Sequence, residues 1–315
     1  METLFLEPYT ILLIAGFIGF FMAFGIGAND VANSMGTSVG SRAITIKQAI
    51  IIAAIFEFLG AFLAGGEVTS TIRKGIVDPE LYVDETNIFV IGMLSALLAG
   101  GTWLYVASLR GWPVSTTHTI VGSIVGFVLI TKGVDAVSWG KVGNIAMSWV
   151  TSPLFSGTLA FGLYISAKKL ILDRSNPGEA AIRYIPFYSF LVAVVISLVT
   201  ARKGLKHVGV EFTDNEVYLF IAIFSSLVGL ATAFFLRRNK QQIMREGGIE
   251  FAFGLLMVVS ASAMAFAHGS NDVANAIGPL AAIVSVVDTG AIGSKAAISP
   301  WVLFVGAIGI VFGLA

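Results

Sequence analysis

The chain contains no cysteine, which excludes a disulfide scaffold, thiolate metal sites and cysteine nucleophiles. It also has little charge. Only 12% of its 315 residues are charged and 56% are hydrophobic, whereas soluble domains contain about 25% charged residues. Lys plus Arg equals Asp plus Glu at 19 each, so nothing indicates a nucleic-acid partner. This composition indicates an integral membrane protein.

Motifs of several catalytic classes are missing as well. The sequence has no Walker loop and no HExxH metalloprotease motif. The N-terminus begins Met1-Glu2-Thr3 without a basic region, so a cleaved signal peptide is not predicted. We therefore expect no enzyme, no bound cofactor and no transport driven by ATP hydrolysis in this chain.

Long apolar runs are abundant, and each is long enough to cross about 30 Å of hydrocarbon. We predict transmembrane segments at 8–28, 44–64, 88–109, 142–166, 184–200, 216–236, 249–268 and 299–315. The stretch 115–131 is apolar too, but it opens with hydroxyl residues. It is either one span or a re-entrant piece followed by a span. The fold class predicted is all-α and multi-pass.

Charge in the connections predicts the orientation of these segments. The connections at 168–183 and 237–246 are basic and read as cytoplasmic, whereas 67–85 is acidic and reads as external. These assignments agree when 115–131 counts as one crossing. The span at 8–28 then runs from outside to inside, and the span at 249–268 runs from inside to outside.

One five-residue motif occurs twice, as Asn29-Asp30-Val31-Ala32-Asn33 and as Asn271-Asp272-Val273-Ala274-Asn275. At an offset of 242, residues 23–36 and 265–278 match at nine of fourteen positions. Because the two copies follow spans of opposite direction, they indicate an inverted-topology repeat. This is the build of many secondary transporters, whose binding sites lie at the repeat interface.

Each copy places a carboxylate between two amides at the end of an apolar run, where such groups are costly unless they bind something. Carboxylate and amide oxygens suit a small hard cation. Nearby glycines, among them Gly27 and Gly269, would permit broken helices whose free carbonyls join the coordination. The alternative is that these side chains only hydrogen-bond neighbouring helices together.

A second motif is Pro113-Val114-Ser115-Thr116-Thr117-His118-Thr119. Proline suits the first turn of a helix and serine its N-cap, so free backbone N–H groups and several hydroxyls would face one point. This predicts a site for a tetrahedral oxyanion that needs no lysine or arginine. An ordinary helix start at the membrane surface is the alternative.

Two further residues are candidates for coupling. Glu57 lies inside an apolar run and reads either as a coupling carboxylate or as one half of a buried pair. His118 reads either as a proton-handling group or as a structural histidine. His268 takes the place of Ile26 of the first copy, so no symmetric role is expected for it.

Together the two Asn-Asp copies and the Pro-x-Ser-Thr-Thr-His stretch resemble the PiT family of inorganic phosphate transporters, which includes the type III sodium–phosphate cotransporters. The resemblance covers essentially the whole chain. It implies two inverted repeats, each with an Asn-Asp helix and a helical hairpin. For the domains it implies a first repeat at 1–183, connecting helices with a basic loop at 184–248, and the start of the second repeat at 249–315.

The resemblance also implies roles for individual residues. Those expected at phosphate are Ser115, Thr116, Thr117, Asn33, Asn275, Asp30 and Asp272. Those expected at sodium are Asp30, Asn29, Asp272, Asn271, Ser115 and Thr117. Glu57 matches a family glutamate implicated in transport. A second hydroxyl motif would begin near position 355 by the same offset, so a separate C-terminal fragment is an expected partner.

The function predicted is sodium-driven symport of inorganic phosphate by alternating access, in a multi-pass protein of the cell (inner) membrane. Sodium is favoured over protons because amide ligands exchange no proton. Proton-coupled or metal-phosphate symport remains the alternative, and a phosphate-selective channel or sensor is the alternative from a different class. Phosphate, sodium and lipid are the expected partners, with a homodimer possible.

Overall fold

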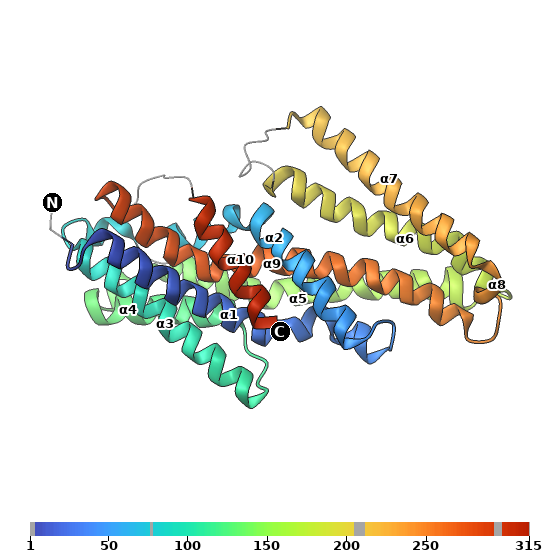
Figure 1. Ribbon diagram of the computed structural model, residues 1–315, viewed down its shortest axis with the longest axis horizontal. Helices are drawn as coiled ribbons and strands as arrows, with labels where there is room; N and C mark the ends of the chain where they lie inside the picture. Colours follow the sequence, from blue (N-terminus) through green and yellow to red (C-terminus); the bar gives the residue numbers. More distant parts are fainter. Residues whose placement is uncertain (1–3, 76–77, 205–211, 293–297, 315) are drawn as a thin grey trace. The chain divides into compact units, whose positions relative to one another are not determined.

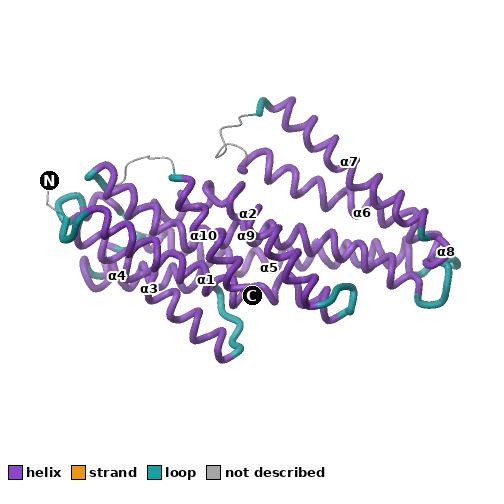
Figure 2. Tube along the Cα trace, in the orientation of Figure 1, coloured by secondary structure: helices purple, strands orange, loops and turns teal. Residues whose placement is uncertain are grey.

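The computed structural model describes residues 4–75, 78–204, 212–292 and 298–314, and within these ranges the chain is helical with no strand (Figures 1 and 2). In chain order the α-helices are α1 (Pro8–Gly40), α2 (Ile46–Gly75), α3 (Thr86–Arg110), α4 (Thr116–Lys132), α5 (Trp139–Ala167), α6 (Pro177–Val199), α7 (Asp214–Arg238), α8 (Lys240–Ile243), α9 (Gly248–Thr289) and α10 (Pro300–Leu314). Short 3-10 or π segments are η1 (Pro79–Tyr82), η2 (Val134–Ala136), η3 (Lys168–Leu172) and η4 (Thr200–Gly204).

The predicted transmembrane segments fall on these helices except at two ends: residues 44–45 precede α2 and residue 299 precedes α10. Residue 315 lies outside the described residues. Among the described residues, seven helices are long and apolar enough to cross a membrane, and α4 and α10 are shorter apolar helices. The stretch predicted at 115–131 forms the single helix α4. The all-α, multi-pass fold is therefore confirmed.

The helices that bear the Asn-Asp motifs are longer than predicted. Helix α1 continues to Gly40 and α9 to Thr289, whereas the apolar runs suggested ends near 28 and 268. The prediction of broken helices at the motifs is wrong, because both helices run unbroken through them. The polar side chains of the motifs are accommodated without a helix break because neighbouring groups hydrogen-bond them, as described below.

The glycines next to the motifs serve close helix packing instead of a break. A Cβ at Gly269 would clash with the backbone of Glu57 on α2, and a Cβ at Gly27 would clash with the carbonyl of Ile310 on α10. Gly27 and Gly269 are equivalent positions at the offset of 242. Small residues of this kind let helix backbones approach closely in membranes. Each copy thus packs against another helix at the same point of the repeat.

Helices α1 and α9 run antiparallel. A Cβ at Gly19 would lie 2.9 Å from the side chain of Leu280, and farther along α1 the carboxylate of Asp30 lies 3.8 Å from the ring of His268. Residue numbers therefore rise along one helix as they fall along the other. This agrees with the opposite directions predicted for the two motif copies from the charges of the connections.

The chain divides into two compact units. The first comprises residues 1–34, 50–141 and 265–315, and the second comprises 35–49 and 142–264. All residues of the Asn-Asp motifs, Glu57 and the hydroxyl motif belong to the first unit. This division follows packing and not internal symmetry, so the repeat boundaries predicted at 1–183, 184–248 and 249–315 stay predictions.

The second unit is built on the pair formed by α6 and α7, which pack against each other (Figures 1 and 2). Its described core gathers residues from η3 through the start of α9: Ile171, Ala181, Ile185, Tyr188, Leu236, Ile243 and Ala252. The hydroxyl of Tyr188 is 2.7 Å from that of Ser166. Helix α7 begins at a capping box formed by Thr213 and Glu216, which satisfies two free backbone N–H groups.

Candidate functional site

The first Asn-Asp copy lies in α1, with its carboxylate inside the first unit. Asp30 is 6% exposed. The side-chain amide of Asn33, one helical turn on, donates to Asp30 Oδ1 at 3.0 Å. Helical spacing alone places these two groups on one face. The carboxylate of the first copy is therefore hydrogen-bonded by an amide of the same motif.

The second copy lies in α9 and repeats this local pattern. The amides of Asn271 and Asn275 approach Asp272 Oδ1 at 3.2 and 3.5 Å. Asn275 is 2% exposed, whereas Asn271 is exposed. The second carboxylate is thus also flanked by two amides, although only one of them is buried.

His268 connects the two copies. Its Nε2 lies 2.9 Å from Asp272 Oδ2 and 3.8 Å from Asp30 Oδ2, and its Nδ1 lies 3.3 Å from Glu57 Oε1. The ring nitrogens are buried and are not directed along hydrogen bonds to these oxygens. One imidazolium could offset only one of three negative charges. The cluster of Asp30, Glu57, His268 and Asp272 is therefore a place where cations are favoured.

One ligand atom each from Asp30, His268 and Asp272 lie within 4.8 Å of one another, a spacing at which a single ion can contact all three. Glu57 is fully buried on α2. Its Oε1 accepts from the hydroxyl of Ser34 at 3.4 Å, and Oε2 has no hydrogen-bond partner among the described residues. A buried carboxylate oxygen without a donor is costly, which supports a cation near Glu57.

The hydroxyl motif forms the turn between α3 and α4, as the predicted helical hairpin requires. Gly111 ends α3 in the left-handed conformation at φ 66°, where glycine is favoured. Ser115 is the N-cap of α4, and its Oγ accepts from the backbone N–H of His118 at 3.2 Å. The start of α4 thus presents backbone N–H groups and hydroxyls, the arrangement that binds anions at helix N-termini.

Both Asn-Asp copies form hydrogen bonds with this turn. Asn29 Oδ1 accepts from the backbone N–H of Val114 at 3.2 Å, and its amide donates to the carbonyl of Trp112 at 3.1 Å. Asn275 donates to the hydroxyl oxygens of Thr116 and Thr117 at 3.2 and 3.3 Å. The predicted cation and anion residues therefore lie together in one unit.

The two copies use their amides differently despite identical sequences. Asn29 binds the turn, whereas its counterpart Asn271 is exposed and bonds the neighbouring aspartate. Asn275 is buried against the turn, whereas its counterpart Asn33 is exposed. Because α1 and α9 are antiparallel, the first amide of one copy and the last amide of the other reach the same α3–α4 turn.

His118 and His268 lie in different surroundings. His118, a predicted coupling candidate, is exposed at the start of α4, while His268 lies in the cluster of carboxylates. Its spacing of four residues from Asp272 on a helix is a signal visible in the sequence. The contacts with Asp30 and Glu57 are not, because they depend on how α1 and α2 pack against α9.

Comparison with known proteins agrees with this arrangement. The model of the phosphate transporter family matches residues 26–315. A Haemophilus influenzae protein named as a phosphate permease is 51% identical over 309 residues, covering 96% of this chain and 73% of that protein. The chloroplastic inorganic phosphate transporter 2-1 of Arabidopsis thaliana is 40% identical over 321 residues, covering 94% and 54%.

A solved structure, "The sodium-dependent phosphate transporter", superposes with a TM-score of 0.88 at 39% identity, covering 97% of this chain and 75% of that one. The matches extend across both Asn-Asp copies and the hydroxyl turn. Members of this family are transporters and not enzymes. The chain belongs to the phosphate transporter family, as the resemblance of its motifs to PiT transporters predicted, and is a multi-pass membrane protein.

Proposed function

We propose that this protein is a secondary active symporter that moves inorganic phosphate together with sodium ions, driven by a sodium gradient. The observation that carries the proposal is the meeting of Asp30, Asp272 and Glu57 around one histidine, beside the hydroxyl turn of α4. The word "sodium-dependent" in the name of the similar solved structure supports the choice of cation.

Sodium is proposed to bind at the two Asn-Asp copies. Hard carboxylate and amide oxygens are suitable ligands for it. In the first copy Asp30 and Asn29 take this role, and in the second copy Asp272 and Asn271. The hydroxyls of Ser115 and Thr117 complete the proposed ligands from the side of α4.

Phosphate is proposed to bind where α4 begins. The hydroxyls and free backbone N–H groups of Ser115, Thr116 and Thr117 would contact its oxygens, and Asn275 already donates to two of these hydroxyls. The proposed remaining neighbours of phosphate are Asn33, Asn275, Asp30 and Asp272.

Coupling follows from charge. A phosphate bordered by Asp30 and Asp272 is repelled until cations neutralise the carboxylates. Glu57 is supported as a coupling residue by its complete burial and its contact with His268. His118 is supported as a coupling residue only by its place in the hydroxyl motif.

Alternating access would then arise by rocking of one inverted repeat against the other around this site, as in other transporters of this build. The antiparallel course of α1 and α9 and the equivalent packing of Gly27 and Gly269 support such a pseudo-symmetric core. We place the protein in the inner cell membrane, in the orientation that the basic connections indicate.

The test is uptake of radiolabelled phosphate into proteoliposomes under an imposed sodium gradient or an imposed pH gradient. The proposal expects accumulation above the external concentration with the sodium gradient alone. Accumulation only with the pH gradient would support proton coupling, and a requirement for a divalent metal would support metal-phosphate symport. Equilibration without accumulation would identify a channel, and binding without flux a sensor.

A further inference from the structure

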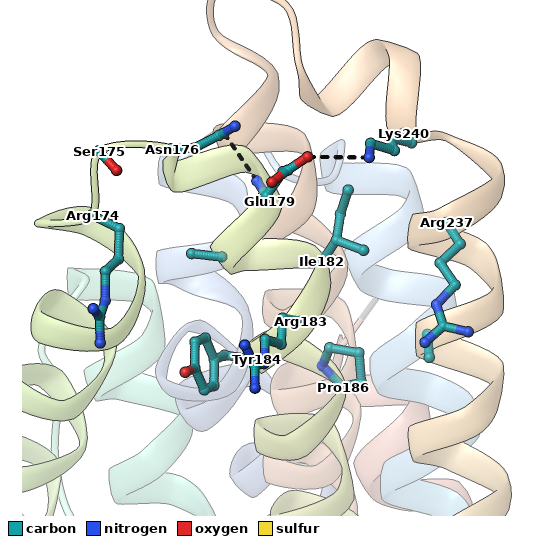
Figure 3. A pocket seen from close by; sticks show the side chains of 12 residues that line it. Arg174, Ser175, Asn176, Glu179, Ile182, Arg183, Tyr184, Pro186, Arg237 and Lys240 are labelled. Carbon is teal, nitrogen blue, oxygen red and sulfur yellow. Dashed lines mark hydrogen bonds and ion pairs between the residues drawn. The ribbon is translucent and has the colours of Figure 1, made fainter.

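A basic pocket lies in the second unit, where α6 begins and α7 ends. It has a volume of about 620 Å³ (Figure 3). It is lined by residues of both helices, of the connection before α6 and of the start of α8. Four cationic side chains line it, and one carboxylate: Arg174, Arg183, Arg237, Lys240 and Glu179. None of these belongs to the Asn-Asp cluster or to the hydroxyl turn, and we call this cavity the α6–α7 pocket.

The single carboxylate of the pocket is already paired. Glu179 Oε1 lies 3.2 Å from Lys240 Nζ, the contact drawn at the top of Figure 3. Within the described part of the chain, Arg174, Arg183 and Arg237 form no salt bridge with a carboxylate. In this view Arg183 lies between the other two. The pocket therefore holds three guanidinium groups without a paired anion.

The start of α6 adds to this positive field. Asn176 caps the helix by accepting from the backbone N–H of Glu179 at 3.3 Å, and both residues line the pocket. The positive end of the α6 dipole therefore lies at the pocket. The ring of Tyr184 lies 5.5 Å below the guanidinium of Arg183, which orients that side chain. A planar guanidinium group can donate two parallel hydrogen bonds to two oxygens of one phosphate, which the ammonium group of lysine does not do.

The pocket also has an apolar side. Ile182, Pro186 and Ala233 line it, and α6 and α7 continue from there as helices apolar enough to cross a membrane. The cations thus lie where one of these helices begins and the other ends. Basic pockets of this kind between transmembrane helices bind anionic headgroups. The connections beside it are the ones predicted to be cytoplasmic.

We propose that the α6–α7 pocket is a second anion site, separate from the transport site, that binds a phosphate group through Arg174, Arg183 and Arg237. The phosphate is that of an anionic phospholipid headgroup or of free inorganic phosphate. Both present the same oxygens to the guanidinium groups. The inference concerns the second unit only and does not depend on which ion drives transport.

The test compares two probes on the purified full chain. Native mass spectrometry measures the affinity for phosphatidylglycerol, and equilibrium dialysis counts bound radiolabelled phosphate. The double variant Arg183→Gln/Arg237→Gln is expected to weaken binding at the pocket about 30-fold, since each basic residue contributes about 1 kcal/mol. The matched control is Arg238→Gln, because Arg238 is the exposed neighbour on the same helix and does not line the pocket.

A second variant is expected to gain affinity, which a misfolded protein would not do. Glu179→Gln removes the carboxylate that pairs with Lys240, so it is expected to tighten binding about fivefold. If the double variant loses affinity for phosphatidylglycerol but still binds as much phosphate as wild type, the ligand of the pocket is a lipid headgroup. If it binds one phosphate fewer per chain, the ligand is free inorganic phosphate. Affinities that are equal in wild type, the double variant and Glu179→Gln for both probes would overturn the proposal.

Discussion

The buried amide of Asn275 donates to the hydroxyl of Thr116 at 3.2 Å and so joins positions 159 apart in the sequence. Through this bond the second Asn-Asp copy, on α9, reaches the first turn of α4. The first copy, on α1, reaches the same turn through Asn29, which accepts from the backbone N–H of Val114. One proposed anion site is thereby held by both halves of a duplicated motif.

Replacing Asn275 with alanine removes both hydrogen bonds to the threonine hydroxyls. We expect the half-saturation concentration for phosphate to rise about tenfold, because each bond contributes about 0.5–1.5 kcal/mol. Initial rates of phosphate uptake in proteoliposomes measure it. Asn144→Ala, at an exposed position of α5, is the matched control and should leave uptake unchanged. An unaltered half-saturation concentration in Asn275→Ala would show that this amide does not contribute to phosphate binding.

Replacing Ser115, Thr116 and Thr117 together with alanine should raise the half-saturation concentration about a hundredfold or more, since hydrogen bonds to charged groups contribute about 1.5–3 kcal/mol each. The same uptake assay measures the change. The control is Ser123→Ala, also on α4, whose hydroxyl bonds only its own helix at Thr119. If affinity survives the triple change, the phosphate binds elsewhere.

Replacing Asp30 or Asp272 with asparagine keeps the shape of the side chain and removes its charge. Sodium-stimulated phosphate uptake should fall to background while expression stays normal, because the proposed cation ligands lose their carboxylate. Asp135→Asn, at an exposed position in η2, supplies the control. Full sodium-stimulated uptake by either motif variant would rule out its role in coupling.

The packing of α2 on α9 makes a prediction about stability. Gly269→Ala places a methyl group against the backbone of Glu57 and should cost about 1–3 kcal/mol, as overpacking does. The thermal unfolding midpoint in detergent should fall. Gly126→Ala on α4, where a Cβ meets nothing within 4 Å, should leave it equal or slightly higher. Equal midpoints for both variants would contradict the close crossing.

Much of the fold followed from local patterns in the sequence. Apolar length placed the predicted segments on helices, of which seven are long enough to cross a membrane in the described chain. The hydroxyl motif located the start of α4 at Ser115, because a helix cap depends on neighbouring residues. The sequence did not predict that α1 and α9 run unbroken through the motifs. Gly27 and Gly269 suggested helix breaks, and only the structure shows that they allow α10 and α2 to pack closely.

The part of the candidate site that depends on spacing within one helix was also predictable. Helical spacing pairs Asn33 with Asp30 and Asn275 with Asp272. It gives no indication that Glu57 meets His268, because that contact depends on the crossing of α2 and α9. The different use of identical amides in the two copies likewise depends on the antiparallel arrangement of α1 and α9.

The most direct test of sodium-coupled transport is a dual-label experiment. Proteoliposomes take up radiolabelled sodium and radiolabelled phosphate under a sodium gradient, and the two fluxes are measured together. We expect both labels to enter in a fixed ratio of about two sodium ions per phosphate, one for each Asn-Asp copy, and both coupled fluxes to vanish in Asp272→Asn. Accumulation of phosphate with no accompanying sodium flux would contradict the account.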